Sequence, residues 1–203
     1  DTVNNPKSNF GIAVESLSGP VYNVVISDNV VRNMCGNGIN LGATNPGSGL
    51  YNIHIVNNLV QGCNNGIADE GQHPRDGVKI IGNTFIDCEV NTSADSTESG
   101  FAILLGYPYT ALSVTGNPIC NTHGNYAVRL TCGDKLVFFS NNILENIGRA
   151  ALFTGGNVIV QDCIITNVGV EDATATAAIL PAYATSKLCV YGCKMTGVRL
   201  PKA

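Results

Sequence analysis

The sequence predicts an all-β fold: a right-handed, single-stranded parallel β-helix (a solenoid) of about seven coils, with three short strands in each coil. Three observations predict it: one apolar pattern recurs along the chain, each copy alternates with period two, and turn-forming residues are abundant. Period-two alternation excludes amphipathic helices. A repeat of 21 to 34 residues with loops of variable length is typical of solenoids.

The composition agrees with many turns and short strands. The chain of 203 residues contains 23 Gly and 24 Asn, whereas charged residues make up only 13 %. Glycine and asparagine both tolerate left-handed backbone at small cost, so they are suited to tight turns. The length suits one domain, residues 1–203, with a continuous core.

The clearest repeat is an alternating strand, a polar pair and two more apolar residues. It reads VVISDNVV, IHIVNNLV, VKIIGNTF, LSVTGNPI, VFFSNNIL, VIVQDCII and CVYGCKM. We take the residue that closes the polar pair as the anchor of each coil. The anchors are Asn29, Asn58, Asn83, Asn117, Asn142, Cys163 and Cys193. Each anchor is expected in a tight turn between the second and third strands of its coil.

A second repeat comes before each anchor and predicts the first strand of each coil. Its copies are GIAV (11–14), GINL (38–41), GIAD (66–69), GFAI (100–103), NYAV (125–128), RAAL (149–152) and TAAI (176–179). The second and fourth positions are apolar and should face the core. The third position should then form an outward row that is nearly all alanine: Ala13, Asn40, Ala68, Ala102, Ala127, Ala151 and Ala178.

These repeats resemble the pectate-lyase-like superfamily of right-handed β-helices, which includes pectate lyases, polygalacturonases and phage tailspikes. The resemblance covers about residues 10–198. It implies that the five anchor asparagines stack into a hydrogen-bonded ladder. The catalytic and calcium-binding motifs of pectate lyases and polygalacturonases are absent from the sequence, so phage tailspikes are the nearest relatives that the resemblance indicates. The fold alone does not define an activity, since it hosts many chemistries.

Charge and cysteine content restrict the partners. A net charge of −4 gives no basic footprint for nucleic acid, and no apolar run approaches a membrane span. The 8 cysteines include no C-x-x-C pair, so we predict neither a metal site nor a cofactor. We expect most of the thiols to be reduced and buried, as in a protein folded in a reducing cytosol.

Carboxylates of the first three coils are the candidate catalytic groups. They are Glu15, Asp69, Glu70 and Asp76. Glu15 and Glu70 are expected two coils apart on one outward row, about 9.6 Å between backbones, which is compatible with an inverting glycosidase. Asp69 takes an otherwise apolar inward position and needs a partner, for which Arg75 is the nearest candidate. A local change of register would instead turn Asp69 outward.

Polar and aromatic residues around these carboxylates are the candidate substrate-binding groups. They are Asn40, His73, Arg75, Tyr107, Tyr109 and Arg129. The two tyrosines flank a proline in a loop, where aromatic rings often stack on sugars. Loops on a rigid scaffold commonly carry function, and the longest loops of this chain occur before residue 100.

The leading hypothesis is a segment of a tailspike-like protein on a virion tail that binds, and in its catalytic version hydrolyses, a bacterial surface polysaccharide. The alternatives are a secreted polysaccharide lyase or epimerase and a non-catalytic β-helix shaft or adhesin. We expect a parallel homotrimer because Leu104, Phe153 and Leu180 form an outward apolar stripe. We also expect a longer parent chain, since neither end of the sequence offers a cap for the stack.

Overall fold

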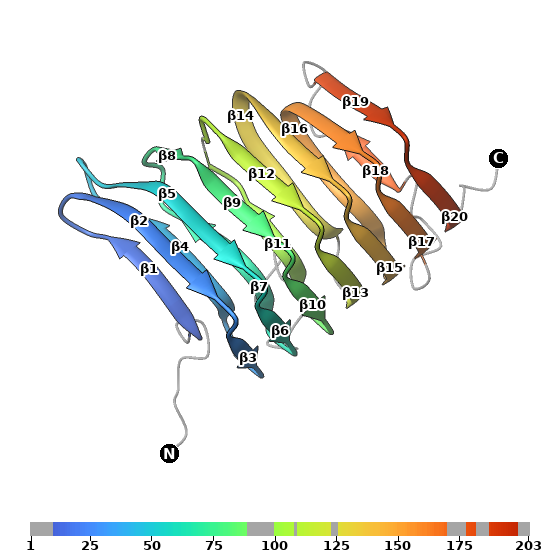
Figure 1. Ribbon diagram of the computed structural model, residues 1–203, viewed down its shortest axis with the longest axis horizontal. Helices are drawn as coiled ribbons and strands as arrows, with labels where there is room; N and C mark the ends of the chain where they lie inside the picture. The colour runs from blue at the N-terminus through green and yellow to red at the C-terminus, as the bar shows by residue number, and fades with distance from the viewer. Residues whose placement is uncertain are drawn as a thin grey trace.

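A computed structural model describes residues 10–88, 100–107, 109–122, 126–169, 178–181 and 187–198, apart from the side chains of 132–134. Within these ranges every regular element is a strand, and the strand pairs are parallel. The strands stack into a solenoid, with the coils following one another along its axis (Figure 1). Seven third strands are separated by six steps, so the chain makes about six turns. This confirms the predicted parallel β-helix.

Each coil contributes strands to two sheets. One sheet has 13 strands and holds the first and second strands of the coils, while the other has seven and holds the third strands. The first strands are β1 (Ile12–Ser16), β4 (Asn37–Ala43), β7 (Asn65–Glu70), β11 (Phe101–Leu105) and β18 (Ile179–Pro181). The second strands are β2 (Pro20–Ser27), β5 (Gly49–Val56), β8 (Arg75–Asp76) with β9 (Val78–Ile81), β12 (Leu112–Thr115) and β19 (Lys187–Tyr191).

Two long strands join the first and second strands of the fifth and sixth coils. These are β14 (Tyr126–Ser140) and β16 (Ala150–Gln161), which cross the corner without a separate loop. The third strands are β3 (Val30–Arg32), β6 (Leu59–Gln61), β10 (Thr84–Ile86), β13 (Pro118–Thr122), β15 (Ile143–Ile147), β17 (Ile164–Val168) and β20 (Lys194–Val198).

The predicted asparagine ladder occupies the turn between the second and third strands. The backbone N–H and the side-chain amide of Asn58 both donate to Oδ1 of Asn83, at 3.0 and 2.9 Å. The same pair of bonds joins each of the five asparagines to the next, from Asn29 to Asn142. The ladder side chains from Asn58 onward are buried. Each therefore satisfies turn groups that water cannot reach.

Cysteines continue this ladder in the last two coils. The Cys163 thiol lies 3.7 Å from the carbonyl of Phe139, and the Cys193 thiol lies 3.8 Å from the carbonyl of Val160. These carbonyls correspond in register to the Val114 carbonyl that accepts from Asn142. A thiol thus takes the position of the amide but offers only a weak donor.

The residue before each anchor is left-handed, which explains the abundance of asparagine and glycine. Its φ is 56° at Asn57, 65° at Gly82 and 55° at Asn141. A second left-handed column lies near the ends of the third strands and includes Asn121, Asn146 and Asn167. Only glycine and a few short polar residues adopt this backbone routinely.

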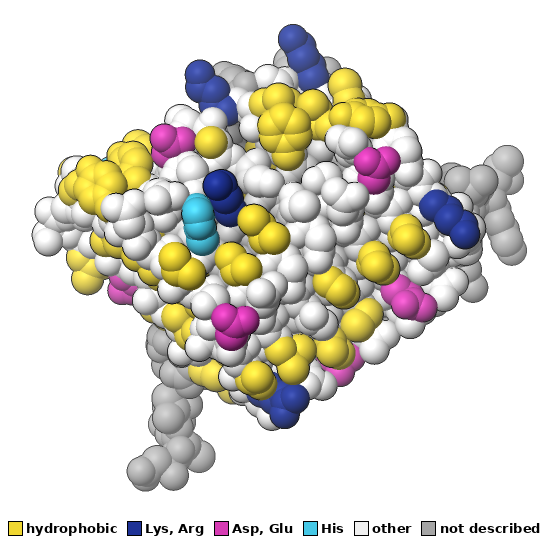
Figure 2. All heavy atoms as spheres, viewed as in Figure 1, with side chains coloured by type: hydrophobic (Ala, Val, Ile, Leu, Met, Phe, Trp, Pro, Cys, Tyr) yellow, Lys and Arg dark blue, Asp and Glu magenta, His cyan; other side chains and the backbone are white. Residues whose placement is uncertain are grey.

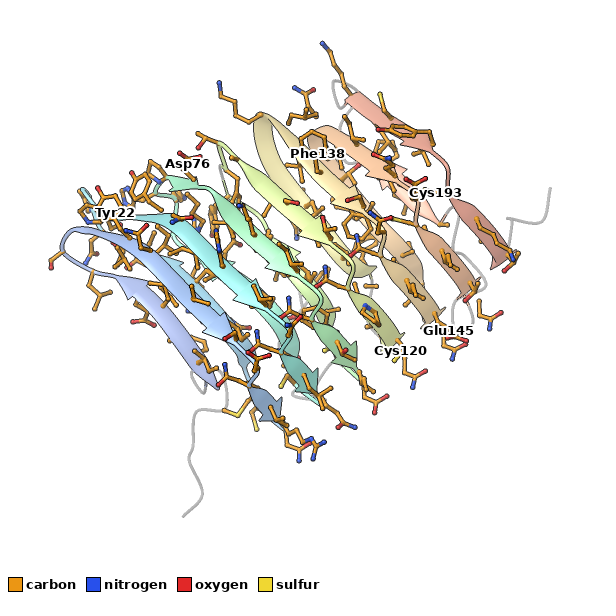
Figure 3. The ribbon with its side chains drawn as sticks, in the orientation of Figure 1. Tyr22, Asp76, Cys120, Phe138, Glu145 and Cys193 are labelled. Carbon is orange, nitrogen blue, oxygen red and sulfur yellow. The ribbon has the colours of Figure 1, made fainter. Side chains whose placement is uncertain are left out.

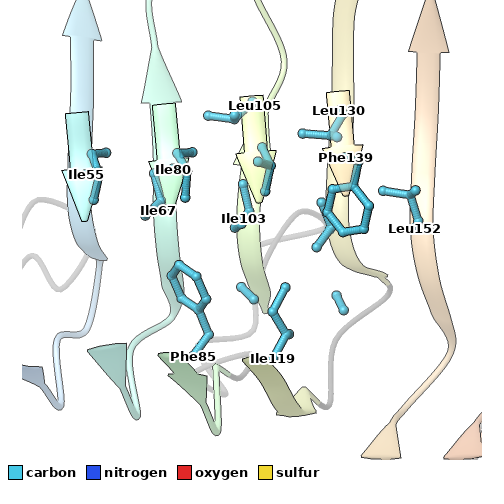
Figure 4. Close-up of a cluster of buried hydrophobic side chains, with 14 of the residues drawn as sticks. Ile55, Ile67, Ile80, Phe85, Ile103, Leu105, Ile119, Leu130, Phe139 and Leu152 are labelled. Carbon is cyan, nitrogen blue, oxygen red and sulfur yellow. The ribbon is translucent and has the colours of Figure 1, made fainter. Parts of the chain in front are cut away.

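The interior is a continuous stack of aliphatic side chains with few aromatics (Figure 4). Ile55, Ile80, Val114, Phe139 and Val160 share one column on the second strands and have no exposed surface. In the last coil the equivalent Val190 is 42 % exposed because no described coil stacks on it. Burial of the core therefore depends on stacking between coils.

One step of the predicted register is wrong. The pattern equated residues 66–69 with 100–103, whereas Ile67 pairs with Ile103 and Ala68 with Leu104, a shift of two. A two-residue shift keeps the same faces inside and outside, so alternation alone could not detect it.

The predicted outward alanine row is also wrong in its second half. Its later members belong to the core cluster: Ala102, Ala127, Ala151 and Ala178. They continue the column of Gly38 and Gly66, where an added Cβ would lie 2.6 Å from side-chain atoms of Val60 and Phe85. Small residues are needed here because the chain turns a corner against the interior, and two consecutive residues face the core.

The exposed apolar residues lie elsewhere than predicted. Leu104, Phe153 and Leu180 are half-buried. By contrast, Val30 is 63 % exposed, and Ile143 and Ile164 are each 42 % exposed, in one outward column of the third strands. Exposed apolar side chains also lie on the second strands, among them Val25 and Phe138, so neither group matches the predicted stripe on the first strands.

Within the described part of the chain the thiols are free, as predicted, but most of them are not buried. None of the seven cysteines whose side chains are described forms a disulfide. Cys63, Cys88 and Cys163 are buried, whereas the other four are half-buried or exposed: Cys35, Cys120, Cys189 and Cys193. The Cys132 side chain lies outside the described residues. Burial raises the pKa of Cys163 to about 11, so this thiol should be protonated and unreactive at neutral pH.

Candidate functional site

A buried polar centre lies at the corner between the first and second strands of the third coil. Asp69 faces inward at the end of β7 and is only 7 % exposed. Its carboxylate accepts hydrogen bonds from the backbone N–H groups of Gly106 and Tyr107, at 2.9 and 3.3 Å, and from the Tyr109 hydroxyl at 3.1 Å. The inward alternative of the sequence analysis is therefore the observed one.

Arg75 holds the loop beside this carboxylate. Its guanidinium is completely buried and donates to four carbonyls at 2.5–3.1 Å, those of Leu41, Glu70, Gly71 and His73. Its Cζ lies 5.4 and 5.7 Å from the ring centroids of Tyr107 and Tyr109. The described contacts of Arg75 are thus with the protein itself, and they fix the loop that carries Glu70.

Burial and the neighbouring donors have opposite effects on the pKa of Asp69. Loss of hydration raises the pKa of this carboxyl group, and the Arg75 guanidinium and three hydrogen-bond donors oppose that rise. Because these donors belong to the next coil, the carboxylate connects the loop of the third coil to that of the fourth. The Asp69 carboxylate therefore has a structural role, because it joins the two loops.

Two other candidate carboxylates face solvent on the first-strand face. Glu15 pairs in register with Gly42, and Gly42 pairs with Glu70, so the two glutamates lie two coils apart in one column. Both are exposed. Gly42 is buried, and a Cβ added there would lie 3.2 Å from Cγ of Glu15, so the Glu15 side chain lies against Gly42. The column of the two glutamates is the predicted arrangement, with about 9.6 Å between the two backbones.

The remaining predicted residues are dispersed. Asn40 is buried and accepts a hydrogen bond from Asn37 at 2.8 Å, while its own Nδ2 has no partner among the described residues. Arg129 is half-buried, with its guanidinium 5.8 Å from the Phe153 ring centroid. His73 and Tyr107 are half-buried at the loop corner, and Asp76 is exposed on the second-strand side. These residues do not form one site.

A groove that the sequence analysis did not predict crosses the outward face of the second strands. It has a volume of about 350 Å³ and lies over β9, β12 and β14. Its lining includes Lys79, Ser113, Leu136, Phe138, Lys135 and Thr110. Figure 2 shows this face of the solenoid, on which charged side chains are few and apolar ones gather in separate groups.

The groove follows from side-chain size across neighbouring coils. Lys79, Ser113 and Phe138 are consecutive in one outward column. The small serine lies between two long side chains, so the surface is hollow at β12. Lys79 and Phe138 belong to coils two steps apart, about 9.6 Å between backbones. No single repeat shows this pattern; it becomes visible only when the coils are aligned.

Hydroxyl groups and aromatic rings border the groove. Ser113 and Thr115 share a hydrogen bond of 3.1 Å, and Thr115 and Ser140 share another. At the other end of the same face, the rings of Tyr22 and Tyr51 stack with centroids 5.0 Å apart. Tyr22, Asp76 and Phe138 follow one another along one edge of the molecule (Figure 3). The face therefore combines flat rings with hydroxyl donors and acceptors.

Two further searches concern the described residues. Among them, no three histidine, cysteine or acidic side chains come together as metal ligands would. The described part of the chain also contains no helix that could span a membrane.

Comparisons with family models, with curated proteins and with solved structures found no match to this chain.

Proposed function

We propose that this protein is a tailspike-like β-helix that binds an extended bacterial surface polysaccharide along the outward face of its second strands. The observation that carries the proposal is the groove between Lys79 and Phe138 with Ser113 at its floor. Sugar rings present an apolar face and a rim of hydroxyl groups. An aromatic ring beside serine and threonine hydroxyls offers contacts to both.

The parallel strands support an extended ligand. Successive coils repeat about every 4.8 Å, so equivalent side chains recur along the axis. Phe138 is 44 % exposed in the fifth coil, and the stacked pair of Tyr22 and Tyr51 lies in the first two coils. A chain-like ligand could contact both aromatic groups at once, which a compact ligand could not.

Filling the groove tests this proposal. We expect Ser113→Phe to weaken binding of a polysaccharide ligand at least about 10-fold in titration calorimetry, because the ring occupies the hollow without entering the core. Thr166→Phe, on the third strands but outside the column of Val30, Ile143 and Ile164, is the matched control and should leave affinity unchanged. If both variants bind like the unmodified protein on a panel of bacterial polysaccharides, the groove is not the binding site.

Hydrolysis is a second candidate function, favoured by the Glu15–Gly42–Glu70 column. In this version one glutamate protonates the glycosidic oxygen and the other activates water. Glu70→Gln should then lower turnover at least about 100-fold. New reducing ends without ultraviolet absorbance indicate hydrolysis, an unsaturated-uronate absorbance indicates a lyase, and binding without products indicates an adhesin.

A parallel homotrimer on a virion tail completes the proposal. Its apolar contact would involve Val30, Ile143 and Ile164 on the third strands, which are the exposed apolar side chains of one column. Sedimentation equilibrium tests it: we expect Ile143→Asp to shift the protein toward monomer. An unmodified protein that is monomeric at micromolar concentration contradicts it.

A further inference from the structure

The charged side chains described in the groove are basic, although the chain as a whole has an excess of acidic residues. The protein has 15 acidic and 11 basic side chains, a net charge of −4. Among the described residues, the groove lining nevertheless includes two lysines and no aspartate or glutamate. In a chain with an acidic excess, a hollow whose described charged groups are both lysines favours a ligand of negative charge.

The two lysines come from opposite sides of the groove. Lys79 is on β9 and Lys135 is on β14, and these strands flank β12 in the sheet. Both side chains are exposed, and neither forms an ion pair with a described carboxylate. A ligand seated over Ser113 would therefore have one ammonium group on each side.

Among the described residues, Asp76 provides a carboxylate near the groove that does not line it. Asp76 is exposed on β8, directly before the groove residues Gly77, Val78 and Lys79. The floor of the groove is the uncharged Ser113, and Asp76 lies outside the described lining. Asp76 also provides a charge of opposite sign that can be removed as a complementary test.

We propose that the groove selects a negatively charged sugar unit, with Lys79 and Lys135 contacting its anionic group and Phe138 packing against its ring. This inference rests on the proposed polysaccharide-binding function. A carboxylate, sulfate or phosphate substituent supplies the same charge, and lysine binds each of them as a point charge rather than by a planar two-point contact.

The test compares three probes of equal chain length: uronic-acid oligosaccharides, sulfated dextran and neutral dextran. We expect Lys79→Met and Lys135→Met each to weaken binding of an anionic probe about 5-fold, the upper range for one exposed ion pair. Binding of neutral dextran should change less than 2-fold. Affinity for the anionic probes should also fall as salt rises from 50 to about 300 mM.

Two matched variants control for general charge. Lys194→Met removes a lysine from the third-strand face and should leave all three affinities unchanged. Asp76→Asn removes the nearby carboxylate and should strengthen binding of the anionic probes about 2-fold. Circular dichroism confirms that each variant is folded before titration.

The outcomes are distinguishable. Preference for the uronic-acid or the sulfated probe, lost with Lys79, supports the inference and identifies the anionic group. Equal binding of neutral and anionic probes that does not depend on either lysine overturns the inference but leaves polysaccharide binding intact. No binding of any probe, together with no ligand in the polysaccharide panel, overturns both.

Discussion

The third and sixth coils both follow the path of the solenoid, but they differ in the polar side chains at two equivalent positions. Asp69 of the third coil and Thr154 of the sixth lie in one inward column, connected in register through Leu105 and Leu130. At the ladder position the third coil has Asn83 and the sixth has Cys163. The third coil thus has charged and amide groups where the sixth has a hydroxyl and a thiol.

Loops explain this difference. In the third coil the chain leaves the sheet between β7 and β8, and its carbonyls and the N–H groups of the next loop need partners. Asp69 and Arg75 provide those partners. In the sixth coil β16 continues through the same corner as one uninterrupted strand, and its backbone pairs with β14. Buried polar side chains are therefore needed where a loop interrupts the strand, and small ones suffice where none does.

Removing the buried guanidinium should have the largest effect. Arg75→Met leaves four carbonyls without their donor, and we expect a loss of about 3 kcal/mol or more in the free energy of unfolding. In the sixth coil, Thr154→Val removes a buried hydroxyl that has no described partner and should change stability by less than about 1 kcal/mol. Urea denaturation measures both. Similar losses in the two variants would contradict the comparison.

The ladder position gives a smaller contrast. Asn83→Leu removes a buried amide that bonds two turn carbonyls and two neighbouring asparagines, and should cost about 1–3 kcal/mol. Cys163→Val loses only weak thiol contacts and should cost less than about 1 kcal/mol. Chemical denaturation of the two variants checks the order of the losses. A greater loss for Cys163→Val would show that the thiol has a structural role equal to the amide.

The smallest effect concerns pH. Because burial raises the pKa of Asp69 above 3.8, the folded state binds this proton more tightly than the unfolded state. The contribution of Asp69 to stability should therefore grow as pH falls from 7 toward 4, and be lost as pH rises through the folded-state pKa. The melting temperature of the unmodified protein, relative to Asp69→Asn, should rise between pH 7 and pH 4.5. An opposite trend would mean that Arg75 and the hydrogen bonds outweigh burial.

Much of the fold was predictable because one signal recurs in every coil. The polar pair, which ends in asparagine in five coils and in cysteine in two, marks a turn that needs left-handed backbone, and few residue types provide it. The same alternation placed Asp69 inward but left an outward position, through a local change of register, as an alternative. Its hydrogen bonds to Gly106 and Tyr107 did not follow from the alternation, because loop conformation is independent of the repeat.

The register error and the missed groove have different causes. Between Asn83 and Asn117 the step is 34 residues, the longest in the chain, and loop length gives no information on which first-strand residues pair across coils. The second strands were aligned correctly, with Lys79, Ser113 and Phe138 at one position of the repeat, and the groove becomes visible only when side-chain sizes are compared along that column. Local periodicity predicts which way a side chain faces, whereas neighbours in adjacent coils depend on register.

The asparagine ladder also gives the solenoid a direction at the level of side-chain dipoles. Every amide from Asn29 to Asn117 donates toward the following coil, and none of these bonds is reversed. Five amide dipoles are therefore aligned head to tail, as peptide groups are in a hydrogen-bonded chain, and each polarises the next. The central rung is polarised from both sides and the terminal rungs from one, so chemically identical asparagines make unequal contributions according to their place in the stack.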